Sequence, residues 1–127
     1  MRKRKPVPTG LELEIMHVVW GRPSVTVRDV YEELLQHRKI AYTTVMTMMG
    51  ILERKGYLQK KRGDKAHLYR PSHPKSRVLR SLVNDFVTRV FNGSAKPLLV
   101  HLLENEKLSE EELEEIAGLM RERRKQP

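Results

Sequence analysis

Cysteine is absent from the 127 residues of the chain. Without it the protein has no disulfide framework, no thiolate zinc site and no cysteine nucleophile. The five histidines, at positions 17, 37, 67, 73 and 101, lack the close spacing of metal ligands. The Asp and Glu residues fall mostly on charged faces of the predicted helices. We therefore predict no metal, no cofactor and no enzymatic activity.

Long apolar runs are also missing. No stretch approaches the roughly 18 apolar residues that a membrane span needs, and no apolar run follows the basic start of the chain to form a signal sequence. A hydrophobic share of 39% is nevertheless enough for a folded core, and 127 residues fit one compact domain or two very small ones. These features predict a soluble, cytoplasmic protein without membrane contact.

Acidic residues are scarce in the front part of the chain. Residues 1–80 hold 18 Lys and Arg against 7 Asp and Glu, whereas residues 81–127 hold 7 against 9. The net charge is +9 and the pI is near 10.0. This distribution predicts a front module that binds a polyanion and a rear part that meets another protein. High solubility alone is the alternative.

Apolar residues recur at helical spacing in three segments of the front part. The first helix is predicted over residues 10–20, opened by a capping box of Thr9 and Glu12. The second runs from about 26 to 37, and the third spans Ala41–Gly56.

Two extended segments follow the third helix. Leu58–Arg62 and Ala66–Arg70 flank Gly63–Lys65, which has the composition of a hairpin turn. The order of three helices and a hairpin predicts a winged helix over residues 1–73. The predicted fold class is therefore mainly α with a small β-hairpin.

Residues 74–127 are predicted to form three further helices, which together make a dimerisation region. The first ends at Asn92–Gly93, the second is a short helix capped by Ser94, and the third opens at Ser109.

The third helix is predicted to lie in the major groove of DNA. Val45, Met48, Met49 and Leu52 define its core side, and the opposite side carries small polar residues, with Gly50 interrupting the helix at a cost of about 1 kcal/mol. A threonine hydroxyl and methyl can both contact base edges. The candidates for base contacts are Thr43, Thr44, Met46 and Thr47. The alternative, strongest for Thr44, is that these hydroxyls only cap free amides.

Basic residues beside this helix are candidates for phosphate contacts. They are Arg54 and Lys55 at the helix end, Lys60, Lys61, Arg62 and Lys65 in the hairpin, and Arg2, Lys3, Arg4 and Lys5 in an N-terminal arm. A solvated charge run in the hairpin and an arm without a role are the alternatives. His67 is either a phosphate contact or an ordinary strand residue.

The rear helices carry more apolar surface than a small tail can bury alone, which predicts a dimer. The candidate dimer residues are Leu79, Leu82, Val83, Phe86, Val87, Val90, Leu99, Leu102, Leu103, Leu113, Ile116 and Met120. A two-fold dimer would place two recognition helices about one DNA turn or a multiple apart, on an inverted repeat. The alternative is a tail that packs only on its own winged helix.

The chain contains four stretches in order between residues 9 and 72: LELEIMHVVW, VTVRDVYEELL, AYTTVMTMMGILERKGYL and AHLYRP. Together they resemble the penicillinase repressor family of bacterial winged-helix regulators. The rear part is similar to the helical dimerisation region of that family through LLVHLLENEKLSEEELEEI. The resemblance implies a homodimeric repressor on a palindromic operator, commonly one that governs resistance or stress genes.

The resemblance also assigns individual residues. The family's contacts from the third helix fall on Thr43, Met46 and Thr47, and Met46 departs from relatives that have a basic residue there. Relatives controlled by cleavage carry an Asn-Phe bond where this chain has His101–Leu102, and copper-responsive relatives use cysteines that this chain lacks. The route of derepression is therefore left open, with a sensor or protease as a candidate partner.

The sequence thus predicts a sequence-specific DNA-binding transcriptional repressor, acting as a homodimer on an inverted-repeat operator of double-stranded DNA. The competing hypothesis is a winged-helix interaction module whose basic face binds an acidic protein partner.

Overall fold

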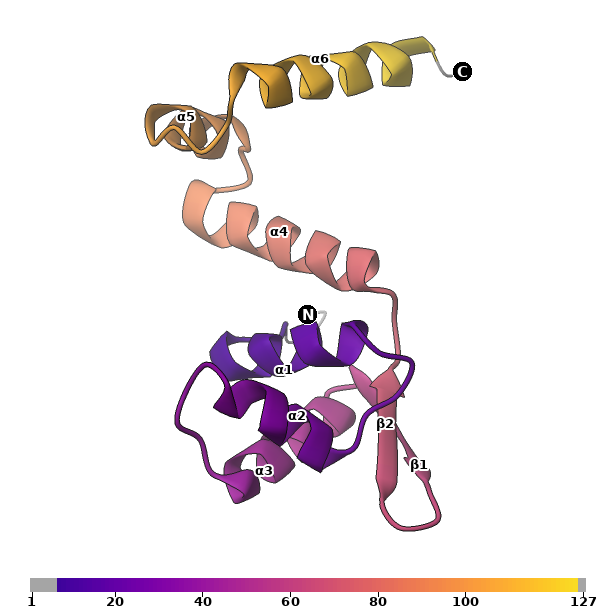
Figure 1. Cartoon of the computed structure of the whole chain (residues 1–127). Coiled ribbons are helices and arrows are strands. Elements are labelled where there is room, and N and C mark those ends of the chain that lie inside the picture. Colours follow the sequence, from indigo (N-terminus) through magenta and orange to yellow (C-terminus); the bar gives the residue numbers. More distant parts are fainter. Residues whose placement is uncertain (1–6, 126–127) are drawn as a thin grey trace. The chain divides into compact units, whose positions relative to one another are not determined.

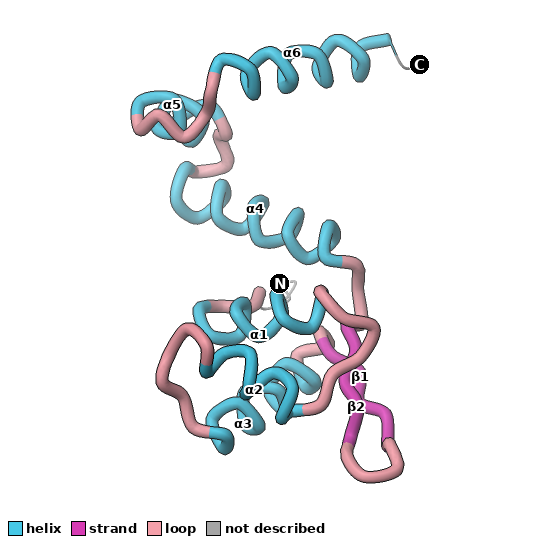
Figure 2. Tube along the Cα trace, viewed as in Figure 1, coloured by secondary structure: helices cyan, strands magenta, loops and turns pink. Residues whose placement is uncertain are grey.

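The computed structural model describes residues 7–125 (Figure 1). The elements in chain order are α1 (Gly10–Trp20), α2 (Val27–Leu35), α3 (Tyr42–Arg54), β1 (Leu58–Arg62), β2 (His67–Pro71), α4 (Lys75–Phe91), α5 (Lys96–Glu104) and α6 (Glu110–Lys125). Figure 2 shows one hairpin within an otherwise helical chain. The predicted fold class, mainly α with a small hairpin, is confirmed. The predicted arm, Arg2 to Lys5, lies outside the described residues.

The front elements form the predicted winged helix, with the β1–β2 hairpin as the wing. The two strands are antiparallel, with Lys60 opposite Tyr69 and Arg62 opposite His67. The Val25 amide donates to the Tyr69 carbonyl at 2.9 Å, and the Tyr69 amide donates back to the Val25 carbonyl at 2.7 Å. This isolated bridge ties the loop before α2 to the base of the wing.

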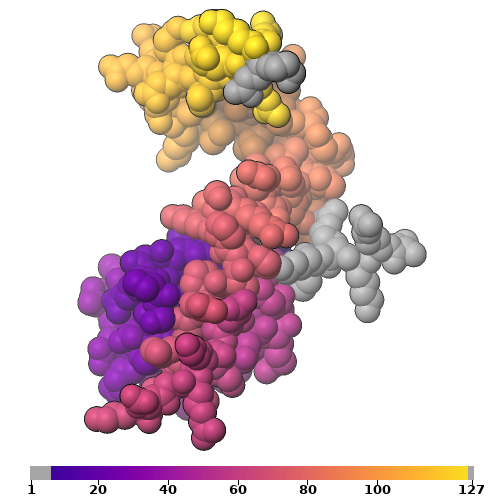
Figure 3. All heavy atoms as spheres, turned by 90° about the vertical axis from the view of Figure 1, so that its right-hand side faces the viewer, coloured from indigo at the N-terminus to yellow at the C-terminus, as the bar shows by residue number. Residues whose placement is uncertain are grey.

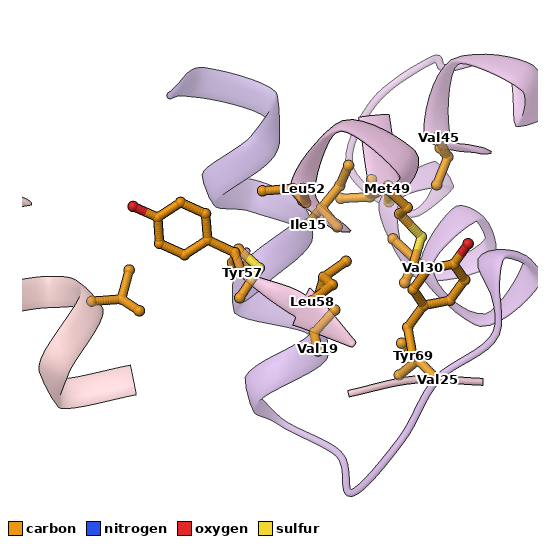
Figure 4. Packing of buried hydrophobic residues seen from close by; sticks show 13 residues of the cluster. Ile15, Val19, Val25, Val30, Val45, Met49, Leu52, Tyr57, Leu58 and Tyr69 are labelled. Atoms are coloured by element: carbon orange, nitrogen blue, oxygen red, sulfur yellow. The ribbon is translucent and has the colours of Figure 1, made fainter. Parts of the chain in front are cut away.

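One apolar core joins the front helices to the hairpin (Figure 4). Its buried members are Ile15, Met16, Val19, Val25, Val30, Leu34, Val45, Met49, Leu52, Tyr57, Leu58, Tyr69 and Val78. Every front element contributes to this set, so α3 and the wing are held by the same packing. This shared core fixes the position of α3 relative to the wing.

Helix α3 ends at Arg54 with Lys55 as its C-cap, and Gly56, the residue that the sequence predicts to close it, follows directly. This glycine has a φ of +88°, a conformation that side chains with a Cβ rarely adopt. The Tyr57 amide donates to the Leu52 carbonyl at 2.9 Å, and the Gly56 amide donates to the Glu53 carbonyl at 3.0 Å. This pair of bonds is a Schellman motif, and buried Tyr57 and Leu52 supply its apolar contact.

Two predicted details differ from the structure. The second strand begins one residue later than expected, at His67, and includes Pro71. Ser94 is not the cap of α5, because Ala95 occupies the N-cap and no side chain caps the helix. Pro97 stands in the first turn of α5, where its fixed φ and missing N–H are tolerated.

The chain divides into two compact units, one ending at Val83 and the other beginning at Asn84. Helix α4 crosses this division. Val78 is buried in the front core, and Leu82 packs half-buried against it. Leu82 therefore contributes to the front core, and its role as a dimer residue stays a prediction. The assignment of residues 1–73 and 74–127 as functional domains stays a prediction.

The second unit has no buried residue among its described positions, 84–125. The rings of Phe86 and Phe91 meet edge to face at 5.7 Å, and Phe91 lies 6.0 Å from the ring of His101. Most of the remaining apolar side chains stay open to solvent. No helix in the described part of the chain has the length and apolar character to cross a membrane.

Candidate nucleic-acid interface

Helix α3 has the two faces that its sequence predicts. Val45, Met49 and Leu52 are buried, and Met48 packs half-buried against the core. On the other side, Thr43, Thr44, Met46 and Thr47 are all exposed. The N-cap is Ala41, and no side chain caps the helix. Thr43 and Thr44 therefore lie inside the helix and not at its N-cap, and their side chains are exposed.

Three of the predicted base-contacting residues line one shallow hollow. Thr43, Thr44 and Thr47 surround it together with Met48, and its volume is about 230 Å³. The hollow combines hydroxyl groups with methyl groups and a thioether. Such a surface can accept a hydrogen bond donor or pack against the methyl group of thymine. Met46 is 48% exposed and lies outside this hollow.

Gly50 occupies the same outward side of α3. A Cβ at this position would meet only the Arg54 Nη1 atom, at 3.7 Å, among the atoms outside its own helix turn. No neighbour within the protein therefore requires a glycine here. The position therefore leaves room for close approach by another molecule.

Lys55 differs from its prediction as a phosphate contact. Its Nζ atom donates to both carboxylate oxygens of Glu12, at 2.9 Å each. The side chain of Glu12 is only 3% exposed and that of Lys55 is 27% exposed. The Thr9 amide and hydroxyl also donate to this carboxylate, at 3.3 and 2.9 Å. Lys55 thus anchors α3 to α1, and we leave it out of the proposed interface.

The charge state of Glu12 follows from these contacts. Burial raises the pKa of Glu12, but hydrogen bonds from Lys55 and Thr9, with the positive charge of Lys55, outweigh burial. The pKa therefore lies below its ordinary value of 4.5. Burial and the nearby Glu12 charge raise the pKa of Tyr57. With its pKa lowered, Glu12 is ionised at neutral pH and can accept the hydrogen bonds from Lys55.

The wing divides its basic residues between two faces. Directly opposed residues in an antiparallel pair share a face, and successive residues alternate. Lys60 with Tyr69 and Arg62 with His67 therefore lie on one face, and Lys61 with Leu68 lies on the reverse. Lys60, Tyr69 and His67 border the space next to α3. The predicted cations of the wing thus point in two directions.

The tip of the wing depends on Gly63. Its amide donates to the Ala66 carbonyl at 3.0 Å, closing the turn that presents Lys65. A Cβ on Gly63 would overlap that carbonyl oxygen, so any side chain would force the turn to open. In Figure 3 the wing tip stands out from the surface of the first unit.

The structure adds residues that the sequence did not single out. A groove of about 590 Å³ runs between α2, α3 and the wing. It is lined by Thr26, Val27, Arg28, Tyr42, Met46, Lys60, Ala66, His67 and Tyr69. Arg28 and Tyr42 were missed because a helical pattern does not show which exposed residue faces the wing. The paired aromatic and basic character of Arg28 and Tyr42 was the available signal.

The remaining predicted phosphate contacts differ in their intramolecular partners. Lys60 lies 3.7 Å from Glu53 in an exposed ion pair. Arg54, Lys61, Arg62 and Lys65 form no ion pair with another described residue. Among the described residues, no anion competes for these four cations.

The predicted dimer residues differ in how far their side chains are exposed to solvent. Val83, Phe86, Val90, Leu99, Leu103, Leu113, Ile116 and Met120 are exposed, and Leu79, Val87 and Leu102 are half-buried. Leu119, which the sequence did not select, is 70% exposed.

The chain is similar to known proteins over most of its length. A family model described as "Penicillinase repressor" matches residues 8–122. The penicillinase repressor of Bacillus licheniformis is 29% identical over 120 residues, which are 94% of this chain and 94% of that protein. The transcriptional regulator BlaI of Mycobacterium tuberculosis is 38% identical over 96 residues, which are 74% of this chain and 70% of that protein.

Solved structures agree with the fold of the front unit. The solution structure of the DNA-binding domain of the repressor BlaI has a TM-score of 0.52 at 29% identity, covering 59% of this chain and 92% of that one. The Bacillus licheniformis BlaI monomer in complex with the blaP half-operator has a TM-score of 0.50, with the same identity and coverage. Since the family model spans most of the sequence, the chain belongs to the penicillinase repressor family.

Proposed function

We propose that the chain is a DNA-binding transcriptional repressor that acts as a homodimer on an inverted-repeat operator. One observation carries the proposal: α3 presents an exposed threonine face, and the basic wing projects beside it from the same core (Figure 1). A helix with short polar side chains can approach base edges in the major groove, and a basic hairpin can follow phosphates.

The family relationship supports this assignment. The BlaI monomer whose fold the front unit shares was solved on a half-operator. A half-operator is what one winged helix of a two-fold dimer would occupy. We therefore assign the base contacts to Thr43, Thr44, Met46 and Thr47. The phosphate contacts are assigned to Arg54, Lys60, Lys61, Arg62 and Lys65.

The second unit supports a homodimer. A unit with no buried residue among its described positions has not covered its own apolar side chains. Each large apolar side chain gains about 1.5–3 kcal/mol when it is buried. A second copy of the chain could bury these apolar side chains against its own. The resulting two-fold dimer would place two α3 helices on an inverted repeat. The proposed site of action is the cytoplasm, with a sensor or protease as a further partner that relieves repression.

Selection of bound fragments from a random pool of duplex DNA tests the proposal. The full chain should enrich one sequence that is repeated in inverted orientation, with half-site centres separated by one helical turn or a multiple. Enrichment of a single unrepeated site would overturn the homodimer. A pool that stays random after repeated cycles would overturn the repressor, and would favour the acidic protein partner instead.

A further inference from the structure

The groove between α2, α3 and the wing carries basic groups on facing walls. Arg28 comes from the first turn of α2, and Lys60 and His67 come from the inner face of the wing. Apolar Val27 and Ala66 also line the groove. A groove that is lined by cationic side chains from both α2 and the wing fits a polyanion that passes along it.

Arg28 is held at this groove by an aromatic platform. Its guanidinium carbon lies 5.8 Å from the centre of the Tyr42 ring. Tyr42, the first residue of α3, is fixed in turn by an edge-to-face contact with Tyr31, at 5.4 Å between ring centres. Stacking on a ring leaves the edge of the guanidinium, with its N–H donors, free to bind an oxyanion.

The present partner of Arg28 is a weak one. Its Nη1 atom lies 3.5 Å from Glu32, in an ion pair whose two side chains are 68% and 61% exposed. Exposed pairs of this kind contribute little to stability. Arg28 can therefore exchange Glu32 for a phosphate at small cost, while Tyr42 keeps it in place.

The position of the groove points to one ligand. If α3 enters the major groove and the wing lies beside it, the DNA strand that separates major and minor grooves must pass between them. We propose that this groove binds the phosphate backbone of that strand, with Arg28 and Lys60 contacting phosphates from opposite walls. The inference rests on the proposed DNA-binding function and adds Arg28 and Tyr42 to its interface, with His67 beside them in the groove.

The test compares two charge-removing variants on the duplex selected above and on a scrambled duplex. Arg28→Gln should lower the slope of log affinity against log salt by about 0.9, the value for one phosphate contact in duplex DNA. The loss should be equal on both duplexes, because phosphates carry no sequence information. Arg80→Gln, an exposed arginine of α4 outside the groove, is the matched control and should leave the slope unchanged.

A second measurement removes the charge from the DNA. Single methylphosphonates along one half-site should identify a phosphate whose neutralisation weakens the wild type and has no further effect on Arg28→Gln. Arg28→Lys should restore the slope. An unchanged slope for Arg28→Gln, or an equal change in Arg80→Gln, would overturn this inference while the wild type still prefers the selected duplex. Loss of that preference in the wild type would instead overturn the proposed function.

Discussion

The ammonium group of Lys55 lies 2.9 Å from both carboxylate oxygens of Glu12, a residue 43 positions earlier in the chain. The contact joins the first turn of α1 to the C-cap of α3. It is the one ion pair in the described part of the chain with a carboxylate that is almost fully buried. It therefore fixes the end of the helix that we assign to DNA.

Replacing Lys55 should destabilise the protein more than replacing Glu12. Lys55→Met leaves the buried Glu12 carboxylate without its cation and should cost about 3 kcal/mol. Glu12→Gln leaves a lysine that can reach solvent and should cost about 1–2 kcal/mol. Urea unfolding at pH 7 measures both values. A larger loss of unfolding free energy for Glu12→Gln than for Lys55→Met would contradict the argument that Glu12 is the more deeply buried partner.

The same pair predicts a pH dependence of stability. The pKa of Glu12 is lower in the folded chain than its ordinary value of 4.5. The stabilisation is therefore fully present above the unfolded pKa and is lost as the pH falls through the folded pKa. The stability difference between wild type and Glu12→Gln should be constant near neutrality and shrink as the pH falls below 4.5. A difference that stays constant down to pH 3 would show that Glu12 is not the group responsible.

Gly50→Ala should change stability and DNA binding in opposite directions. Alanine is favoured over glycine inside a helix by about 1 kcal/mol, and its Cβ meets only Arg54 here. The melting temperature should therefore rise. Affinity for DNA should fall, because the added methyl group would separate α3 from the duplex. Unchanged affinity in the stabilised variant would show that Gly50 does not face DNA.

The outcome for α3 shows what a sequence can predict. Its bounds and core side follow from the spacing of Val45, Met49 and Leu52 and from Gly56, since both features are local. The Glu12 to Lys55 pair depends on how α1 packs against α3, and neither residue's neighbours in sequence indicate it. For this reason the sequence does not reveal that Lys55, predicted as a phosphate contact, is engaged with Glu12.

Two other features also depend on packing between elements, which the sequence pattern does not show. Helix α4 carries a continuous apolar stripe, and periodicity alone does not show that Val78 and Leu82 pack on the front core while Val90 stays exposed. Arg28 has the pattern of an ordinary exposed helix residue. Its place beside Tyr42 follows from the packing of α2 against α3, which sequence spacing does not contain.

The homodimer is tested by two charged substitutions in the second unit. Val90 and Leu99 are 56% and 48% exposed in the single chain. The wild type should elute with twice the 14.9 kDa mass of one chain at micromolar concentration. Val90→Asp and Leu99→Asp should elute as monomers, because a buried unpaired carboxylate is costly. Light scattering coupled to size exclusion gives the masses.

Leu35→Asp is the control for those variants. It places the same charge on an exposed leucine of α2, outside the predicted interface. It should remain a dimer. Dissociation by Leu35→Asp, or a monomeric wild type, would contradict the assignment of the second unit.

The central claim is that α3 reads sequence through its threonine face while the cations around it bind phosphate. The most direct measurement is the affinity of wild type and Thr47→Ala for the selected and scrambled duplexes over a series of salt concentrations. For the wild type, log affinity should fall linearly with log salt by roughly 0.9 per phosphate contact. Thr47→Ala should lose about 1–3 kcal/mol on the selected duplex and almost nothing on the scrambled one. Equal losses on both duplexes, or weak binding of the wild type to both at every salt concentration, would contradict the account.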